Sequence, residues 1–268
     1  MNILLLDIFK SFVGIVTQEK GGHMGISSTN NEKHSEFSII GTISWLFLLS
    51  VGIQAGVDII IRLAVNVSGY EVKEIESIFL HPDIMLIMVI MTAIISIPLI
   101  KRAAHSTDKM FPFVFLALKA TENSTLIKII SAGFIYYSLI SLFMPWLDID
   151  YPQYMLDVKS HVKSTVDLIF LILTVCIIAP IFEEVVFRGL TFSRFQSSKF
   201  GTIGAVFITS IIFSILHFQY EPIAMLFIFV DAILLSFVRY KTENVTYCIA
   251  LHILFNSLST FQLFFLHS

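Results

Sequence analysis

Seven long runs of apolar residues, separated by short polar stretches, dominate the sequence. A helix needs about 20 residues to cross the hydrocarbon core of a bilayer, and each run is close to that length or longer. The pattern therefore predicts an all-α, polytopic membrane protein with about seven transmembrane helices. The runs cover residues 37–61, 84–103, 125–147, 166–190, 201–218, 222–240 and 244–266.

The first 36 residues do not fit this pattern. Met1–Val16 is apolar but contains Asp7 and Lys10, and it has neither a cationic leader nor a small-residue cleavage site. We interpret it as an interfacial helix rather than a signal peptide, with a short span as the alternative. A polar linker rich in Gly, Ser and Asn follows. We expect residues 1–36 to form this interfacial segment and linker, and residues 37–268 to form a single membrane domain.

The composition supports a membrane protein. Of the 268 residues, 56% are hydrophobic and only 14% are charged, whereas about 25% of the residues of a soluble domain are charged. The net charge of −3 gives no reason to expect a nucleic-acid partner. Cys176 and Cys248 both lie in apolar runs, and we interpret them as small core residues rather than as a disulfide or a metal-binding pair. Gly52 and Gly56 form a GxxxG pattern, which predicts a close helix contact.

The charges between the runs predict the orientation. Lys and Arg gather in the loops after the second, fourth and sixth runs, and acidic residues gather on the opposite side. Because basic loops remain in the cytoplasm, we expect a multi-pass protein of the cell membrane with its N-terminus inside. The basic residues are Lys101, Arg102, Lys109, Lys119, Arg194, Lys199, Arg239 and Lys241, and the acidic ones are Glu71, Glu74, Glu76, Asp83, Asp148, Asp150 and Asp157.

Three charged residues lie within or directly beside the most apolar stretch, where a charge costs roughly 2.5–3.5 kcal/mol. Glu184 and Arg188 are four residues apart, so they share one helix face and predict an ion pair. Glu183 is rotated by about 100° from Glu184 and is left for another partner. A partly desolvated carboxylate without a cation is a better base than one in water, which suits Glu183 to act as a general base.

Two later runs carry matching polar groups. His217 follows Phe213 by four residues, and His252 precedes Asn256 by four. His252 and Asn256 therefore share a helix face and could donate hydrogen bonds to an oxyanion. His217 is a natural partner for Glu183, and Phe213 is expected to line the core or a pocket. Such a set suits hydrolysis of an amide by an activated water, in one site to which several helices contribute.

The depths of these residues in the membrane set a condition on that site. At about 1.5 Å per residue, His217 lies further from the basic end of its helix than Glu183 and His252 do from theirs. Convergence requires the fifth helix to start late or the turn at 219–222 to dip into the bundle, and we expect a funnel open toward the cytoplasmic side. Asp231 is a further buried acid, either satisfying a packing partner or belonging to the site.

Three blocks of the sequence resemble the signature of the CPBP family of intramembrane proteases, also called the Abi family, which includes the type II CAAX prenyl endopeptidases. The family pattern is EExxxR, then FxxxH, then HxxxN or HxxxD. The first block lies in Ala179–Gly189, the second is Phe213–His217 and the third is His252–Asn256. The resemblance covers about residues 165–260, which we interpret as the catalytic core.

The resemblance implies an intramembrane endopeptidase whose partners are the lipid bilayer and a membrane-associated peptide or protein substrate, such as a prenylated or leader peptide. It assigns roles to six residues: Glu183 and His217 would activate water, His252 and Asn256 would stabilise the oxyanion, and Glu184 and Arg188 would support the site. The chain has no HExxH, GxSxG or GxGD motif, which argues against other classes of intramembrane protease.

The cofactor and two competing functions stay open at this point. The family has been called a metalloprotease, and Glu183, His217 and His252 could supply the three protein ligands of a catalytic zinc. A metal-free glutamate mechanism fits the same residues. A non-catalytic member of the family, acting as a bacteriocin immunity or regulatory partner, would keep the residues as a binding cavity. A transporter would use the acids and histidines as a proton relay.

Overall fold

The structure is a computed structural model that describes residues 38–68, 76–104, 116–143 and 151–266. The predicted interfacial segment and linker at 1–36 lie outside the described residues. Within the described residues every regular element is a helix. The α-helices are α2 (Ile39–Phe47), α3 (Ile53–Val67), α5 (Pro82–Ala104), α7 (Asn123–Phe143), α8 (Gln153–His161), α9 (Thr165–Leu171), α10 (Ala179–Glu184), α11 (Phe192–Gln196), α12 (Gly201–Ile215), α13 (Pro222–Thr242) and α14 (Val245–Phe261).

Four short π-helical segments, in which the chain is wound more loosely, join these helices into longer rods. The segment η1 (Leu48–Gly52) joins α2 to α3, and η5 (Gln262–Leu266) extends α14. The two others, η3 (Ile172–Ile178) and η4 (Val185–Thr191), flank the six residues of α10. The continuous helix 165–196 therefore changes its winding on both sides of the two adjacent glutamates.

In the part of the chain that the structure describes, six helical rods are long and apolar enough to cross a membrane, which confirms an all-α polytopic membrane protein. They are Ile39–Val67, Pro82–Ala104, Asn123–Phe143, Thr165–Gln196, Pro222–Thr242 and Val245–Leu266. The fifth predicted run differs, because α12 ends at Ile215. Its 15 residues extend only about 22 Å, less than the roughly 30 Å hydrocarbon core. The residues after it, His217 included, form a turn.

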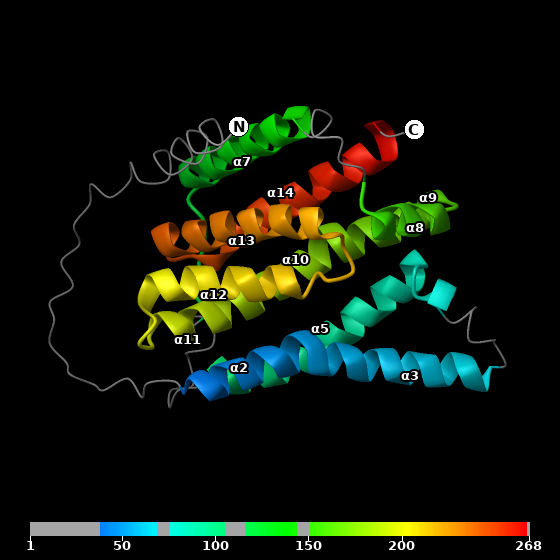
Figure 1. The fold of residues 1–268 in the computed structure, drawn as a ribbon, viewed down its shortest axis with the longest axis horizontal. Helices are drawn as coiled ribbons and strands as arrows, with labels where there is room; N and C mark the ends of the chain where they lie inside the picture. Colours follow the sequence, from blue (N-terminus) through cyan, green and yellow to red (C-terminus); the bar gives the residue numbers. More distant parts are fainter. Residues whose placement is uncertain (1–37, 69–75, 105–115, 144–150, 267–268) are drawn as a thin grey trace, which may run out of the picture.

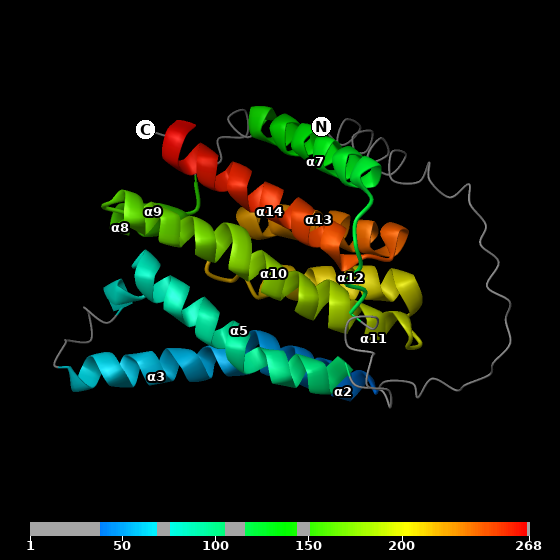
Figure 2. The same ribbon diagram turned by 180° about the vertical axis from the view of Figure 1, so that it is seen from behind.

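The rods pack in layers (Figure 1). The rod of α2 and α3 lies with α5 at one side, the helix 165–196 and α12 form the middle, and α13 and α14 separate them from α7 at the other side; the view from behind shows the same order (Figure 2). The α12–α13 turn stops well short of the bundle end that α3, α9 and the end of α14 reach. The turn thus lies at an intermediate depth along the bundle, as convergence of the polar groups requires, although most of residues 219–222 are exposed.

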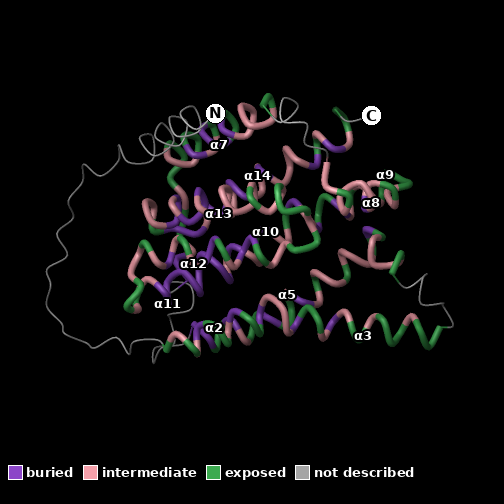
Figure 3. Tube along the Cα trace, viewed as in Figure 1, coloured by how far each residue is buried: buried purple, intermediate pink, exposed green. Residues whose placement is uncertain are grey.

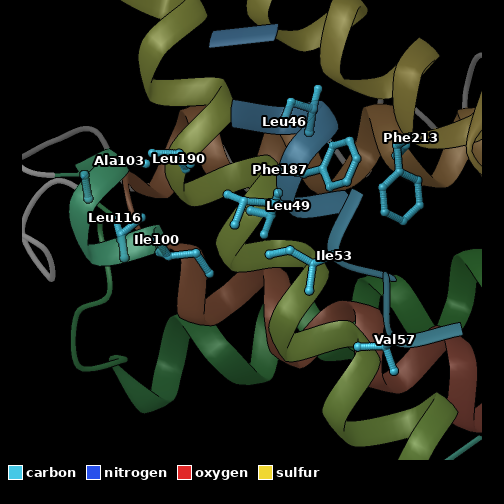
Figure 4. Close-up of a cluster of buried hydrophobic side chains, with 13 residues drawn as sticks. Leu46, Leu49, Ile53, Val57, Ile100, Ala103, Leu116, Phe187, Leu190 and Phe213 are labelled. Atoms are coloured by element: carbon cyan, nitrogen blue, oxygen red, sulfur yellow. The ribbon is translucent and has the colours of Figure 1, made fainter. Parts of the chain in front are cut away.

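Burial is concentrated in the middle layer (Figure 3). One apolar cluster joins α2, α5 and the helix of the glutamates, with Leu49, Ile100 and Leu190 among its members (Figure 4). A second cluster joins α7, α13 and α14. Many large apolar residues of α2, α3, α5 and α7 are exposed at the outer faces, as expected for helices that contact lipid.

Close helix contacts lie at other glycines than those predicted. A methyl group at Gly56 would meet nothing within 4 Å, so the expected contact of the GxxxG pattern is wrong for the described residues. A methyl group at Gly133 would instead overlap Leu251 of α14, and one at Gly189 would lie 3.3 Å from the carbonyl oxygen of Leu116. Gly189, which follows Arg188 in the first motif, therefore lets Leu116 approach the helix 165–196, called the site helix below.

Candidate active site

Glu184 and Arg188 form the buried ion pair that their spacing predicts. Arg188 Nη1 donates to Glu184 Oε1 over 2.8 Å, and both side chains are fully buried. Arg188 Nη2 donates to the carbonyl oxygen of Ala232 on α13 over 2.9 Å. The guanidinium carbon also lies 4.7 Å from the ring centre of Phe213. The pair therefore ties the site helix to α13 and presents its charges to the protein interior rather than to lipid.

The same carboxylate holds His252 of α14. His252 Nδ1 lies 2.8 Å from Glu184 Oε1. Because an ionised carboxylate only accepts hydrogen bonds, we assign the proton of this contact to Nδ1. In the neutral imidazole the other nitrogen, Nε2, then carries a lone pair. Glu184 thus fixes both the orientation and the tautomer of His252, in the way that a buried carboxylate orients a catalytic histidine.

Glu183 lies at the open end of this chain of contacts. Its Oε2 is 3.8 Å from His252 Nε2, and 28% of its side chain is exposed, whereas Glu184 is fully buried. The separation is too long for a direct hydrogen bond but leaves both atoms facing one small region. Two acceptors so placed can hold one water molecule between them. Adjacent glutamates therefore have opposite environments, as the helical rotation between them predicts.

Phe213 and His217 bring the end of α12 to the same region. The ring of Phe213 lies 4.8 Å from that of His217 and 5.8 Å from that of His252, measured between centres. His217 Nδ1 lies 2.7 Å from the carbonyl oxygen of Phe213 and must donate to it. Among the described residues, the ion-pair contact of Glu183 is with His252 rather than with His217. Phe213 therefore lies against both imidazoles.

Asn256 points its amide at the backbone of the site helix. Its Nδ2 donates to the carbonyl oxygen of Val175, in η3, over 2.8 Å. One of its two amide hydrogens is thereby in use. An oxyanion role for Asn256 would need the second hydrogen, and one for His252 would need a proton on Nε2. Both roles stay predictions.

Tyr220 is a neighbour of the site that the sequence did not single out. Its ring stacks on that of His217, with centres 6.1 Å apart, and meets Tyr154 edge-on at 5.6 Å. Burial raises the pKa of the Tyr220 hydroxyl above its ordinary value, and the nearby Tyr154 and Glu183 raise that pKa further. The hydroxyl therefore remains protonated at neutral pH. No spacing pattern connects this tyrosine with the motifs, so only the fold reveals it.

Asp231 has a partner on another helix. The hydroxyl of Tyr136 on α7 donates to Asp231 Oδ1 over 2.9 Å. The contact favours the interpretation of Asp231 as a residue that satisfies a packing partner. Tyr136 also lies against Phe255 of α14, with ring centres 5.7 Å apart.

Two arginines assigned to loops are in fact buried in helices. Arg239 lies in α13 and donates from Nε to the carbonyl oxygen of Arg188 over 3.0 Å. Arg194 lies in α11 and donates from Nη2 to the carbonyl oxygen of Ala103 over 2.9 Å. Each is 7% exposed. An arginine near the end of an apolar run looks the same in sequence whether it anchors the helix in the headgroup region or bonds a neighbouring helix, which explains the error.

The two cysteines are free and buried, as expected for small core residues. Within the described residues, no group of three or more His, Cys, Asp or Glu side chains is arranged to hold a metal ion. The predicted zinc ligands Glu183, His217 and His252 therefore do not form such a group. We therefore derive no reaction step through a metal.

Comparison with known proteins bears out the resemblance for this part of the chain. Residues 165–258 match the family described as "Type II CAAX prenyl endopeptidase Rce1-like". The chain is also similar to an "Uncharacterized 24.3 kDa protein" of Escherichia coli, with 34% identity over 93 residues. That alignment covers 34% of this chain and 42% of the relative, so the chain spans less than half of the relative's length. No solved structure matches the chain. All the polar residues of the three motifs lie within the matched segment.

Proposed function

We propose that this integral membrane protein is an intramembrane endopeptidase that hydrolyses a peptide bond of a membrane-associated peptide or protein. The observation that carries the proposal is the buried chain of contacts from Arg188 through Glu184 and His252 to the half-open carboxylate of Glu183. Such a series of charges gives a bilayer-spanning bundle little stability, because each charge must be removed from water. Its presence therefore favours a functional role. The match of residues 165–258 to prenyl endopeptidases supports the same activity.

In the proposed reaction, one water molecule lies between Glu183 Oε2 and His252 Nε2 and is held by both acceptors. Glu183 takes a proton from this water while the water oxygen attacks the carbonyl carbon of the substrate. The tetrahedral intermediate then collapses: its carbon–nitrogen bond breaks, and Glu183 returns the proton to the leaving amine. The products are a new carboxyl terminus and a new amino terminus, and Glu183 is ionised again.

The remaining residues support these two acceptors. Glu184 fixes the His252 tautomer that exposes a lone pair at Nε2, and Arg188 balances the charge of Glu184. His217, with its Nδ1 bound to the Phe213 carbonyl, can turn only Nε2 toward water or substrate. Phe213 gives the site an apolar wall next to both imidazoles. The proposed reaction needs no oxyanion donor from Asn256, whose amide already donates one hydrogen bond to the Val175 carbonyl oxygen.

We also propose that the protein lies in the plasma membrane with its basic helix ends in the cytoplasm. Lys101 and Arg102 end α5, Lys241 lies at the end of α13 and Lys199 precedes α12, and these ends lie at the same end of the bundle (Figure 2). Basic residues favour the cytoplasmic face. The sequence pattern also favours a site that opens toward that face.

Peptide profiling tests the proposed activity without knowledge of the substrate. Membranes from cells that make the wild-type protein, the Glu183→Gln variant or neither would be compared by mass spectrometry. Peptides with new termini should appear only with the wild-type protein. Equal profiles from wild type and variant, at equal amounts of inserted protein, would instead favour a non-catalytic binding protein.

A further inference from the structure

We infer that Asn256 is a positioning residue: its amide replaces a backbone N–H that Pro180 lacks and thereby holds the turn of helix that carries Glu183 and Glu184. An asparagine amide has two hydrogens that could bind an oxyanion, but one amide hydrogen of Asn256 already donates to the backbone of η3. The inference rests on the proposed function, because its kinetic test needs peptide cleavage. It gives Asn256 a different role from oxyanion binding.

The hydrogen bonds around Pro180 carry the inference. The backbone N–H of Ala179 donates to the carbonyl oxygen of Thr174, five residues earlier, as in a π-helix. Continuing this pattern, the next residue would donate to the carbonyl oxygen of Val175. The next residue is Pro180, which has no N–H. The Nδ2 of Asn256 donates to this Val175 oxygen over 2.8 Å instead.

The position of this carbonyl makes the replacement important. Val175 lies in the middle of the helix 165–196, where the bilayer offers no water to satisfy an exposed carbonyl. Glu183 follows Pro180 by less than one helical turn. A change in winding by one residue turns a side chain by about 100°. Loss of the Asn256 contact would therefore rotate Glu183 away from His252 without touching either residue.

Side chains also donate hydrogen bonds to backbone carbonyls of two other π-helical segments, so the Asn256 contact belongs to a type that recurs in this fold. In η4, Arg239 Nε donates to the carbonyl oxygen of Arg188 over 3.0 Å. In η5, Lys159 Nζ donates to the carbonyl oxygen of Leu263 over 2.7 Å. The Asn256 contact differs from these in having a proline at the position that would otherwise supply the donor.

A rescue experiment separates positioning from oxyanion binding. In Pro180→Ala the new residue brings the missing N–H, so the double variant Pro180→Ala/Asn256→Ala restores a donor for Val175 but no amide at position 256. The matched control is Pro98→Ala/Asn256→Ala, because Pro98 also lies inside an apolar helix, α5, but far along the chain from the site. The melting midpoint in detergent, kcat and KM would be measured for the wild type, each single variant and both double variants.

We expect Asn256→Ala to lower kcat at least tenfold, with KM little changed, and to lower the midpoint. Pro180→Ala/Asn256→Ala should recover most of both losses, and the Pro98 control should recover neither. Failure of the midpoint to recover overturns the inference, and so does recovery of the midpoint without kcat, because Asn256 would then be needed for chemistry. If Asn256→Ala does not accumulate in membranes, recovered accumulation of the Pro180 double variant supports the inference and continued absence opposes it.

The two proposals fail in different ways. If the wild-type protein cleaves no peptide, the proposed function is wrong, but the midpoints of the same five variants still test whether Asn256 replaces the missing N–H. If peptides are cleaved and the double variant is not rescued, the proposed function stands and Asn256 returns to the chemical step.

Discussion

Two ion pairs with the same sequence spacing lie in opposite environments in this protein. Asp58 and Arg62 on α3 are 2.7 Å apart, and their side chains are 30% and 44% exposed. Glu184 and Arg188 are 2.8 Å apart and fully buried. The first pair lies near the end of its helix, where a long side chain can reach the headgroup region, and Arg62 also covers the ring of Phe79. The second pair is surrounded by protein: Arg188 donates to the Ala232 carbonyl oxygen of α13, and Glu184 is bonded to the imidazole of His252 on α14.

The difference indicates that burial, and not the pair itself, distinguishes the part of the molecule that contains the candidate site. In the described part of residues 38–104, the buried polar side chains are those of Thr42, Thr92 and Ser96. In the segment 165–258, five Glu, Arg or His side chains are buried: those of Glu184, Arg188, Arg194, Arg239 and His252. The first region holds apolar helices against lipid, and the second holds charges away from it.

The largest contrast is expected between Glu183→Gln and Glu184→Gln. Loss of a general base should slow peptide cleavage about 100- to 10,000-fold, and Glu183→Gln should keep its melting midpoint because the side chain is partly exposed. Glu184→Gln leaves Arg188 buried without a counter-charge and should lose about 3–5 kcal/mol of stability. Cleavage rates and unfolding of purified variants in detergent check both. Similar midpoints for the two variants would show that the environments of the glutamates do not differ as described.

Removing each arginine sharpens the comparison of the ion pairs. Arg188→Met should destabilise the protein by about 3–5 kcal/mol, since Glu184 would remain buried and unpaired. Arg62→Met, its matched control, should cost less than about 1 kcal/mol because its pair is exposed. Unfolding by a denaturing detergent measures both losses. Equal losses would contradict the distinction drawn here.

Replacement of the two histidines should change the stability of the protein by different amounts but abolish peptide cleavage in both cases. His252→Ala removes a hydrogen bond from a buried carboxylate and should cost about 1.5–3 kcal/mol. His217→Ala should cost less, because His217 lies in a turn and is partly exposed. We expect both variants to lose cleavage. An active His217→Ala protein would remove His217 from the site and leave Glu183 and His252 as the water-binding pair.

The smallest effect is expected at Tyr136 and Asp231, which take no part in the contacts from Arg188 to Glu183. Tyr136→Phe removes the hydroxyl that donates to Asp231 and should cost about 1 kcal/mol with little effect on the cleavage rate. A large loss of activity with an unchanged midpoint would instead place Asp231 in the catalytic site. The same purified preparations used for the other variants serve for this measurement.

Local spacing was enough to predict much of this arrangement. The helix rotation between Glu183 and Glu184, and the ion pair of Glu184 with Arg188, depend only on helical geometry and were predicted correctly. The partner of Glu183 depends on how α12 and α14 pack, and the short α12 leaves His217 in a turn. Likewise, the contact of Asn256 with Val175 depends on winding in η3, which no apolar pattern reveals. The burial of Arg239 needed the position of a third helix.

The most direct test of the central claim is a single-turnover assay in ¹⁸O-labelled water with protein in lipid nanodiscs. The substrate would be a peptide found by the profiling experiment, and the new carboxyl terminus would be analysed by mass spectrometry. If Glu183 activates water as proposed, the wild-type protein should place one ¹⁸O atom in the new carboxyl terminus and Glu183→Gln should yield no product in the same time. Cleavage by Glu183→Gln at the wild-type rate would contradict the account.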